Sequence, residues 1–438
     1  MATKISFVSL GCDKNLIDSE IMLGLIDEKG YIITPNDSEA DVIIINSCGF
    51  ILDANQEAID KVLEMADYKA NGNCKALIVT GCMAQRYKDE IFESLPEVDA
   101  VVGTGDFENI GAVIDRLLNG EKKVQLVTDI NHLLNENNSY KRMVTTTGGF
   151  SYLKIAEGCD NRCTYCTIPS LRGKYRSRNI ESLVKEAEIL ADKGVRELIL
   201  IAQDTSLYGK DLYGEQKLHV LLQEISKIED IKWIRILYCY PENVYDELID
   251  EMASNPKVLH YLDMPVQHTN DRILKLMGRR STGDKIKDTV NRLRAKMPDM
   301  CIRTTLITGF PTETQEEFES VIDFMKEVKF DRLGVFTYSP EEGTPACRMD
   351  GQIDEEIKAQ RKESIMEAQM EISAELGQKF VGKTLEVIVE GKIEDEDDLY
   401  CGRSFRDCYE IDGFVFFKKN LLQEISITSR LLLQEIMT

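Results

Sequence analysis

The sequence contains no apolar run that approaches the ~20 residues needed to cross a bilayer. It also begins without a recognisable secretion signal, because the first residues lead directly into a strand-like stretch at 5–10. From these two absences we expect a cytoplasmic protein that has no membrane partner.

Histidine is scarce, and positive charge is outnumbered by negative charge. The 438 residues carry 53 Lys and Arg against 76 Asp and Glu, for a net charge of −23, and they include 4 His. A chain this acidic repels nucleic-acid phosphates unless it has a local basic patch, and it is steered towards basic partners. Cysteine, in contrast, is plentiful. Twelve cysteines without a secretion signal argue for metal or redox chemistry rather than for disulfides.

Three of these cysteines lie in one short loop, with the spacing C-x3-C-x2-C: Cys159, Cys163 and Cys166. Such a loop can wrap three thiolates around one corner of an iron–sulfur cube, which leaves one iron open to a small molecule. Zinc is the rival metal, but structural zinc sites use four closed ligands and no histidine lies nearby. Buried cysteines without a ligand are the remaining alternative, and the polar residues at 160–162 argue against it.

Residues 1–130 alternate strand-like and helix-like runs, which predicts a parallel sheet flanked by helices. Cys12, Cys48 and Cys82 each follow one of the strand-like runs. Because the carboxyl ends of parallel strands share one edge of the sheet, three loops there could bring these thiolates to one point. The alternative, three unrelated core residues, must explain the same placement three times. Cys74 breaks the pattern, and we expect it to be structural.

A polar segment at 131–149, rich in Asn, Thr and Gly, is expected to be a linker. Strand–helix alternation resumes over 150–350 and gives six units, too few for a closed eight-stranded barrel. An amphipathic helix is predicted over 351–376, and β-like runs over 377–438. The candidate strands of the central region are 150–156, 197–202, 233–239, 261–266, 301–308 and 330–338.

Several of these predicted strands end in polar residues, which usually face the ligand in parallel α/β folds. Gln203 and Arg303 lie in such stretches, whereas His268 is expected to be a satisfied structural histidine. The segment 172–178 contains Arg172, Arg176 and Arg178 and is basic within an acidic chain. It could hold a carboxylate by bidentate contacts, or it could be a solvated loop.

The three-cysteine loop, with Tyr165 before its last cysteine, resembles the signature of radical S-adenosylmethionine (SAM) enzymes. The resemblance implies a six-stranded (β/α)6 partial barrel and a 4Fe–4S cluster whose open iron binds SAM. One electron then cleaves SAM to a 5′-deoxyadenosyl radical. Gly309, in a Gly-Phe-Pro turn, resembles the glycine that lets the adenosine approach the backbone. We expect cofactor contacts from Tyr165, Gln203, Arg303 and Gly309, and no catalytic side chain beyond the cluster ligands.

The segments 10–20, 46–50 and 81–87 resemble the N-terminal domain of methylthiotransferases. This resemblance implies that Cys12, Cys48 and Cys82 hold a second 4Fe–4S cluster, again with one open iron. Near the end of the chain, 402–407 and 410–414 resemble TRAM, a small β-barrel that closes this family. Its closing strands are not recognisable after Lys419, where Leu-Leu-Gln-Glu-Ile occurs twice, at 421–425 and 432–436. The barrel could therefore be incomplete.

Methylthiotransferases divide by substrate. One group modifies an adenosine in tRNA, and the RimO-type group adds a methylthio group to the β-carbon of an aspartate in a small-subunit ribosomal protein. The segments 11–20, 156–161 and 203–205 resemble the second group. Charge agrees, because residues 377–438 hold 8 Lys and Arg against 12 Asp and Glu, whereas a module that grips tRNA should be basic.

We therefore predict a RimO-type enzyme with two 4Fe–4S clusters and SAM, acting on a basic ribosomal protein. It would need a sulfur source and an electron donor such as flavodoxin or ferredoxin. Two alternatives stay open: a tRNA adenosine methylthiotransferase, and a non-catalytic iron–sulfur protein that relays electrons.

Overall fold

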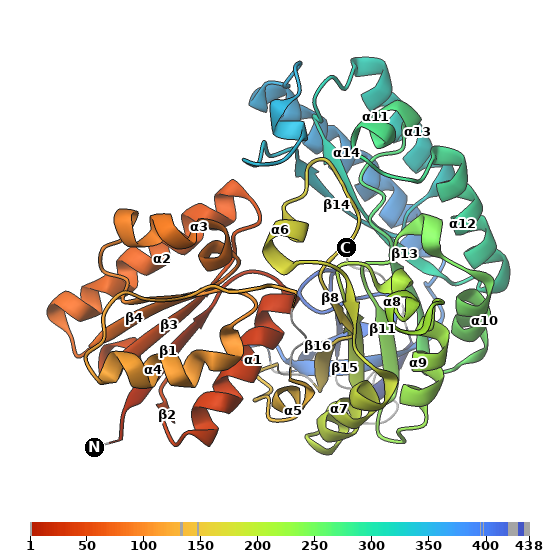
Figure 1. The fold of residues 1–438 in the computed structure, drawn as a ribbon. Coiled ribbons are helices and arrows are strands. Elements are labelled where there is room, and N and C mark those ends of the chain that lie inside the picture. The colour runs from red at the N-terminus through yellow and green to blue at the C-terminus, as the bar shows by residue number, and fades with distance from the viewer. Residues whose placement is uncertain are drawn as a thin grey trace.

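The computed structural model describes residues 2–131, 135–146, 149–394, 396, 398–418 and 428–432. These residues form an N-terminal α/β domain, a larger central α/β domain and a small C-terminal antiparallel sheet (Figure 1). Figure 1 shows the N-terminal domain, in red and orange, beside the central domain, in yellow to teal. The predicted fold class is confirmed.

The N-terminal sheet is parallel, in the order β2-β1-β3-β4-β5-β6. Its strands are β1 (Lys4–Ser9), β2 (Ile32–Ile33), β3 (Val42–Ser47), β4 (Ala76–Gly81), β5 (Ala100–Val102) and β6 (Val124–Leu126). β3 and β4 are buried along their whole length, because helices cover both faces of the sheet. Apolar residues of α1 (Asp13–Glu28) and α4 (Ile110–Leu118) pack on one face. Those of α2 (Leu52–Asn71) and α3 (Cys82–Ser94) pack on the other.

The central sheet is also parallel and has the order β14-β13-β12-β11-β10-β7. Its end strands β7 and β14 do not pair with each other in the described residues, so the barrel is open between them, as the radical SAM resemblance implies. The strands are β7 (Phe150–Lys154), β10 (Glu197–Ile201), β11 (Trp233–Ile236), β12 (Val258–Asp263), β13 (Cys301–Thr308) and β14 (Arg332–Thr337). A two-stranded ribbon of β8 (Ala156–Glu157) and β9 (Arg176–Ser177) flanks the short helix α6 (Ile168–Arg172).

Helices cover the outer side of this partial barrel (Figure 1). They are α7 (Ile180–Asp192), α8 (Lys210–Tyr213), α9 (Leu218–Ser226), α10 (Asp246–Ser254), α11 (Asp271–Leu276), α12 (Gly283–Lys296) and α13 (Gln315–Val328). Local sequence fixes several of their starts. α13 begins with a capping box in which Thr314 and Glu317 satisfy each other's backbone N–H groups, and Asn179 caps α7.

Two strands differ from their predicted bounds. β12 begins at Val258 and ends at Asp263, whereas the sequence predicted 261–266. β11 begins where predicted but ends at Ile236 rather than at 239. Pro265 explains the end of β12, because proline has no N–H to donate to a ladder. Beyond it, only Gln267 forms a bridge, with Leu306.

The long helix α14 (Glu355–Gln378) leads to the C-terminal sheet, whose order is β17-β16-β15-β18. Its strands are β15 (Thr384–Lys392), β16 (Leu399–Ser404), β17 (Val415–Lys418) and β18 (Thr428–Leu432). β18 pairs antiparallel with β15, with Thr384 opposite Leu432. This strand was not predicted from the sequence, because it has only one β-branched residue, Thr428. Residues 421–425 lie outside the described residues, as do 433–436 of the second repeat.

The segment 131–149, which we expected to be a linker, lies between β6 and β7, and part of it is packed. It contains the short helix α5 (Glu136–Ser139), and Met143 N–H donates to the Glu20 carbonyl of α1 at 2.9 Å. Arg142 is 1% exposed and lies between the two domains. No helix in the described part of the chain is long and apolar enough to cross a membrane.

Candidate active site

The cysteines of the N-terminal domain lie at the carboxyl edge of its sheet. β1, β3 and β4 are adjacent strands, Cys12 and Cys48 follow the first two, and Cys82 opens α3 directly after β4. A Cβ atom added at Gly11 would lie 3.0 Å from the Cβ of Cys48. One added at Gly49 would lie 2.6 Å from the backbone nitrogen of Met83. Glycine at 11 and 49 therefore lets the three cysteine loops approach one another.

The side chain of Asn15 ties these loops together. Its Nδ2 donates to the carbonyl of Leu10 at 3.2 Å and to that of Ser47 at 3.1 Å. Its Oδ1 lies 3.7 Å from the sulfur of Cys82. Asn15 is fully buried, so one amide fixes the backbone before Cys12, the backbone before Cys48, and the thiol of Cys82.

The three thiols are close enough to affect one another electrostatically. Burial raises the pKa of the Cys82 thiol to about 12; Arg172 opposes the rise, and the thiolates of Cys12 and Cys48 add to it. Burial also raises the pKa of Cys48, with a further contribution from Cys12. Protonated thiols are therefore favoured without a metal, and a bound cation would displace the protons.

The second set of cysteines lies between β8 and α6. The backbone N–H of Cys159 donates to the carbonyl of Gly173 at 3.0 Å, and that of Cys166 donates to Cys163 at 3.2 Å. Burial raises the pKa of Cys159 to about 11. Burial also raises the pKa of Cys166, and the negative charge of the Cys163 thiolate adds a smaller contribution. The loop thus holds its three thiols in a mostly buried pocket where they affect one another, like the first set.

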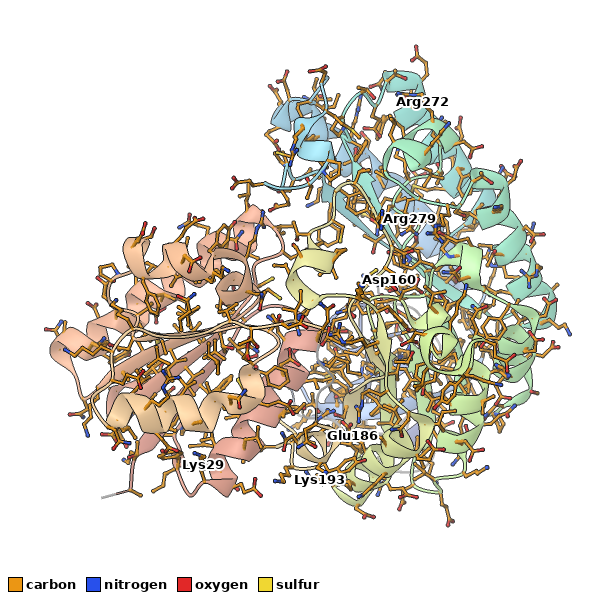
Figure 2. All side chains as sticks on the ribbon, viewed as in Figure 1. Lys29, Asp160, Glu186, Lys193, Arg272 and Arg279 are labelled. Atoms are coloured by element: carbon orange, nitrogen blue, oxygen red, sulfur yellow. The ribbon has the colours of Figure 1, made fainter. Side chains whose placement is uncertain are left out.

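Neighbouring elements fix this loop. Thr164 donates its backbone N–H to Met277 at 2.9 Å and its hydroxyl to Leu276 at 2.8 Å. Asn161 Nδ2 donates to Asp204 Oδ2 at 3.0 Å. Figure 2 shows Asp160 of this loop and Arg279 in the same central region of the molecule.

The residues present fit iron–sulfur clusters and an anionic ligand. No group of three or more His, Cys, Asp or Glu in the described residues could hold a single metal ion. Cubane ligands bind different irons, so their sulfurs stand farther apart than the ligands of one ion. Beside the second set, Arg279 is 6% exposed, its Nε and Nη1 have no hydrogen-bond partner in the described structure, and its guanidinium lies 4.0 Å from the ring centre of Tyr240. Buried unpaired donors of this kind suit an anion.

A cavity of about 530 Å³ is lined by residues close in sequence to one cysteine of each set. Phe50 to Asp53, just after Cys48, form one wall, and Tyr165 of the second loop contributes to another. Thr305 and Ile307 of β13 and Phe336 of β14 line its side on the barrel.

The four residues expected to contact the cofactor have different surroundings. Tyr165 lies in the cluster loop and lines the cavity. Gln203 donates to Glu157 Oε1 at 2.7 Å. Gly309 has φ +72°, and a Cβ there would meet the stem of Lys358 in α14. Arg303 pairs with Asp263 at 2.7 Å and lines a different cavity, shared with the C-terminal sheet.

The other sequence candidates also have definite surroundings. His268 is buried, its Nε2 lies 3.0 Å from Glu313 Oε1, and its Nδ1 accepts from the Asn270 N–H, which suits the structural role expected. Arg172 is buried rather than solvated. Sequence reasoning missed Asn15, Asp204 and Arg279. Asn15 lies within the sequence motif around Cys12, and this position was the signal that could have identified it as a site residue.

Comparison with known proteins agrees with this geometry. The Radical SAM superfamily profile matches residues 153–325, that of the uncharacterized protein family UPF0004 matches 4–103, and that of the TRAM domain matches 381–429. A solved radical SAM methyltransferase, TsrM from Kitasatospora setae, has a TM-score of 0.57 at 13% identity, covering 79% of this chain and 74% of TsrM. That likeness concerns the fold alone. The fold and the cysteine loop define a radical SAM enzyme.

Relatives with similar sequences show which group of radical SAM enzymes the chain belongs to. A Clostridium botulinum protein named ribosomal protein uS12 methylthiotransferase RimO is 52% identical over 421 residues, covering 95% of this chain and 93% of the relative. The protein of the same name from Lachnoclostridium phytofermentans is 51% identical, covering 94% of this chain and 93% of the relative. The chain belongs to the RimO family of radical SAM methylthiotransferases, as the sequence motifs predicted.

Proposed function

We propose that this enzyme adds a methylthio group to the β-carbon of an aspartate in ribosomal protein uS12. The observation that carries the proposal is the pair of three-cysteine sets, which adjacent residues connect: Arg172 lies 3.6 Å from Cys82, and the Gly173 carbonyl accepts the N–H of Cys159. Support for the substrate comes from the names of relatives about 50% identical along nearly the whole chain. Replacing hydrogen on an unactivated carbon is beyond side-chain acids and bases, which explains the need for a radical source.

In this proposal Cys12, Cys48 and Cys82 hold one 4Fe–4S cluster, and Cys159, Cys163 and Cys166 hold the other. Cys159, Cys163 and Cys166 would hold the cluster that supplies one-electron reduction of SAM, and Cys12, Cys48 and Cys82 would hold the one that supplies sulfur. The chain's own residues position these groups: Asn15 holds the first set of loops, and Thr164 and Asn161 anchor the second. Tyr165, Gln203, Arg303 and Gly309 stay predicted cofactor contacts.

The electrostatics favour a basic protein as substrate. The chain has a net charge of −23. A protein this acidic attracts basic chains and repels nucleic-acid phosphates. The proposal places the reaction in the cytoplasm, where ribosomal proteins are made, with a flavodoxin or ferredoxin as electron donor and a separate sulfur source.

The test is incubation of the reconstituted enzyme with SAM, a reductant, sulfide and purified uS12, followed by mass spectrometry of peptides. We expect one SCH3 group in place of a hydrogen on an aspartate, together with 5′-deoxyadenosine. A Cys159→Ala variant should form neither product. Cys74→Ser is the matched control, because Cys74 is buried but its thiol donates to the Ala76 carbonyl, away from both sites.

Two results would overturn the proposal. Modification of an adenosine in added tRNA, with uS12 unchanged, would move the enzyme to the tRNA group. Absence of 5′-deoxyadenosine under strong reduction, in protein loaded with iron, would indicate a non-catalytic electron carrier.

A further inference from the structure

One arginine contacts the N-terminal cysteine site, and the residue after it contacts the other. Arg172 is the last residue of α6, follows Cys166 by six positions, and is 3% exposed. We propose that Arg172 is a positioning residue that joins the two sites and raises the reduction potential of the N-terminal cluster. The inference rests on the proposed function, because it takes Cys82 to be a cluster ligand.

The guanidinium of Arg172 reaches from the central domain into the N-terminal domain. Its Nη2 lies 3.6 Å from the sulfur of Cys82 and donates to Asn15 Oδ1. Its Nη1 donates to Asp18 Oδ2 at 2.5 Å and to Glu157 Oε2 at 3.4 Å. The arginine is therefore directed at the cysteine site by a hydrogen-bond fork that only a planar guanidinium provides.

Asn15 makes this contact specific. The amide that accepts from Arg172 is the one that holds the backbone before Cys12 and before Cys48. Arg172 thus completes a chain of contacts that touches all three N-terminal cysteine loops. Its removal leaves Asn15 Oδ1 buried with only the weak thiol donor of Cys82.

The backbone beside Arg172 holds the other site. The carbonyl of Gly173 accepts the N–H of Cys159 at 3.0 Å. The main chain at Gly173 is therefore fixed relative to Cys159 of the three-cysteine loop 159–166, called the SAM loop below. The side chain of Arg172 is fixed relative to Cys82. Arg172 and Gly173 together therefore connect the two sites.

The local charges leave one nitrogen of Arg172 directed at the cysteine. Lys154 lies 2.6 Å from Asp18 and 2.7 Å from Glu157, so two cations and two carboxylates form one buried network. Arg172 contacts both carboxylates of this network through Nη1. Its Nη2 is therefore left to face Asn15 and Cys82. A cationic donor at a ligand sulfur stabilises the extra negative charge of a reduced cluster, and hydrogen bonds to sulfur are known to set cluster potentials.

The test measures the midpoint potential of the N-terminal cluster alone. In full-length protein carrying Cys159→Ala, Cys163→Ala and Cys166→Ala, only the N-terminal site can load iron, at roughly four atoms per chain. An EPR-monitored redox titration then compares this background with the same background carrying Arg172→Gln. We expect Arg172→Gln to lower the potential by at least ~59 mV, a tenfold change in a one-electron equilibrium.

Two further variants separate the contact from folding and from charge alone. Arg172→Lys keeps the charge and much of the stem but has no fork, so we expect a smaller shift in the same direction. Lys174→Gln removes a cation from the same loop, but its side chain is exposed, so we expect an unchanged potential.

An unchanged potential in iron-loaded Arg172→Gln or Arg172→Lys protein would overturn the inference. A shift of equal size in Lys174→Gln would also overturn it, because the effect would then be one of general charge. Failure of the triple-alanine background itself to load iron is a different result, since it would remove the proposed N-terminal cluster.

Discussion

Arg142 and Glu20 form a buried ion pair between the two large domains, with Nε 2.8 Å from Oε2 and both side chains 1% exposed. Arg142 also pairs with Glu186 of α7 at 2.8 Å and donates to the Tyr152 carbonyl at 2.8 Å. Figure 2 labels Glu186 and Lys193, at the base of the central domain, where Lys193 donates to the Arg142 carbonyl. A segment whose composition indicated a flexible linker therefore fastens the domains together.

Replacing this arginine should destabilise the whole chain. Arg142→Ala leaves Glu20 with a buried, uncompensated charge and removes one cation from Glu186, so we expect a loss of about 3–5 kcal/mol in the free energy of unfolding. Urea denaturation followed by circular dichroism measures it. The neighbouring Lys141→Ala is the control, because its pair with Glu28 is exposed and should contribute less than about 1 kcal/mol. Equal losses in the two variants would contradict the interpretation.

Iron content should separate the two cysteine sites. Reconstituted wild-type enzyme is expected to hold roughly eight irons per chain, four in each cubane cluster. Cys48→Ala and Cys163→Ala should each lower this to roughly four, because one site loses a ligand and the other is intact. Cys74→Ser should leave the value unchanged. A wild-type value of roughly four would remove one of the proposed clusters.

Gly158, which directly precedes Cys159, should not tolerate a side chain. Its φ is +81°, and an added Cβ would lie 2.6 Å from the backbone carbonyl carbon of Lys174. Gly158→Ala should therefore displace the loop and lower iron content to about half. Gly194→Ala is the matched control, since Gly194 has φ +96° with nothing within 4 Å, and should cost only the backbone strain of about 1–2 kcal/mol. Full iron content in Gly158→Ala would refute the expectation.

Arg279 should contribute to SAM binding. Two of its donors have no partner in the described structure and lie near Tyr165 and Cys163, and a hydrogen bond to a charged group contributes about 1.5–3 kcal/mol. Arg279→Met should therefore weaken SAM binding by about 10- to 100-fold in equilibrium dialysis of iron-loaded protein. Arg272→Met is the control, because Arg272 is half exposed and pairs with Glu317. An unchanged affinity in Arg279→Met would exclude this role.

Asp204 should make stability depend on pH. Burial raises its pKa to about 6, although Ser206 and Asn161 donate to the carboxylate, whereas an unfolded aspartate titrates near 3.9. The folded state therefore binds the proton more tightly, and the wild type should lose stability as pH rises from 5 through 6. Asp204→Asn removes this loss. Melting temperatures of iron-loaded wild type and variant between pH 5 and 7.5 should diverge as pH rises, and a constant difference would contradict the assignment.

The sequence indicated much of the fold and both cysteine sets, because these signals are local. Strand–helix alternation predicted both parallel sheets, and the strand ends predicted where Cys12, Cys48 and Cys82 would lie. The supporting contacts could not be found in this way. Arg172 and Asn15 are 157 positions apart, and Arg279 meets the SAM loop from α11's end, so only tertiary packing pairs them. The burial of Arg142 could not be predicted, because the polar composition of a segment indicates only its average exposure and does not identify a single buried ion pair.

The contact between Arg172 and Cys82 can form only late in the synthesis of these two domains. Chains emerge from the ribosome N-terminus first, and domains generally fold as they appear. The N-terminal sheet and its three cysteines are therefore complete in sequence long before residue 172 is synthesised. Until then Asn15 and Asp18 lack their arginine, and the cysteine pocket is open on the side that α6 later covers. The N-terminal cysteine pocket can therefore close only after the loop of Cys159, Cys163 and Cys166 has been translated.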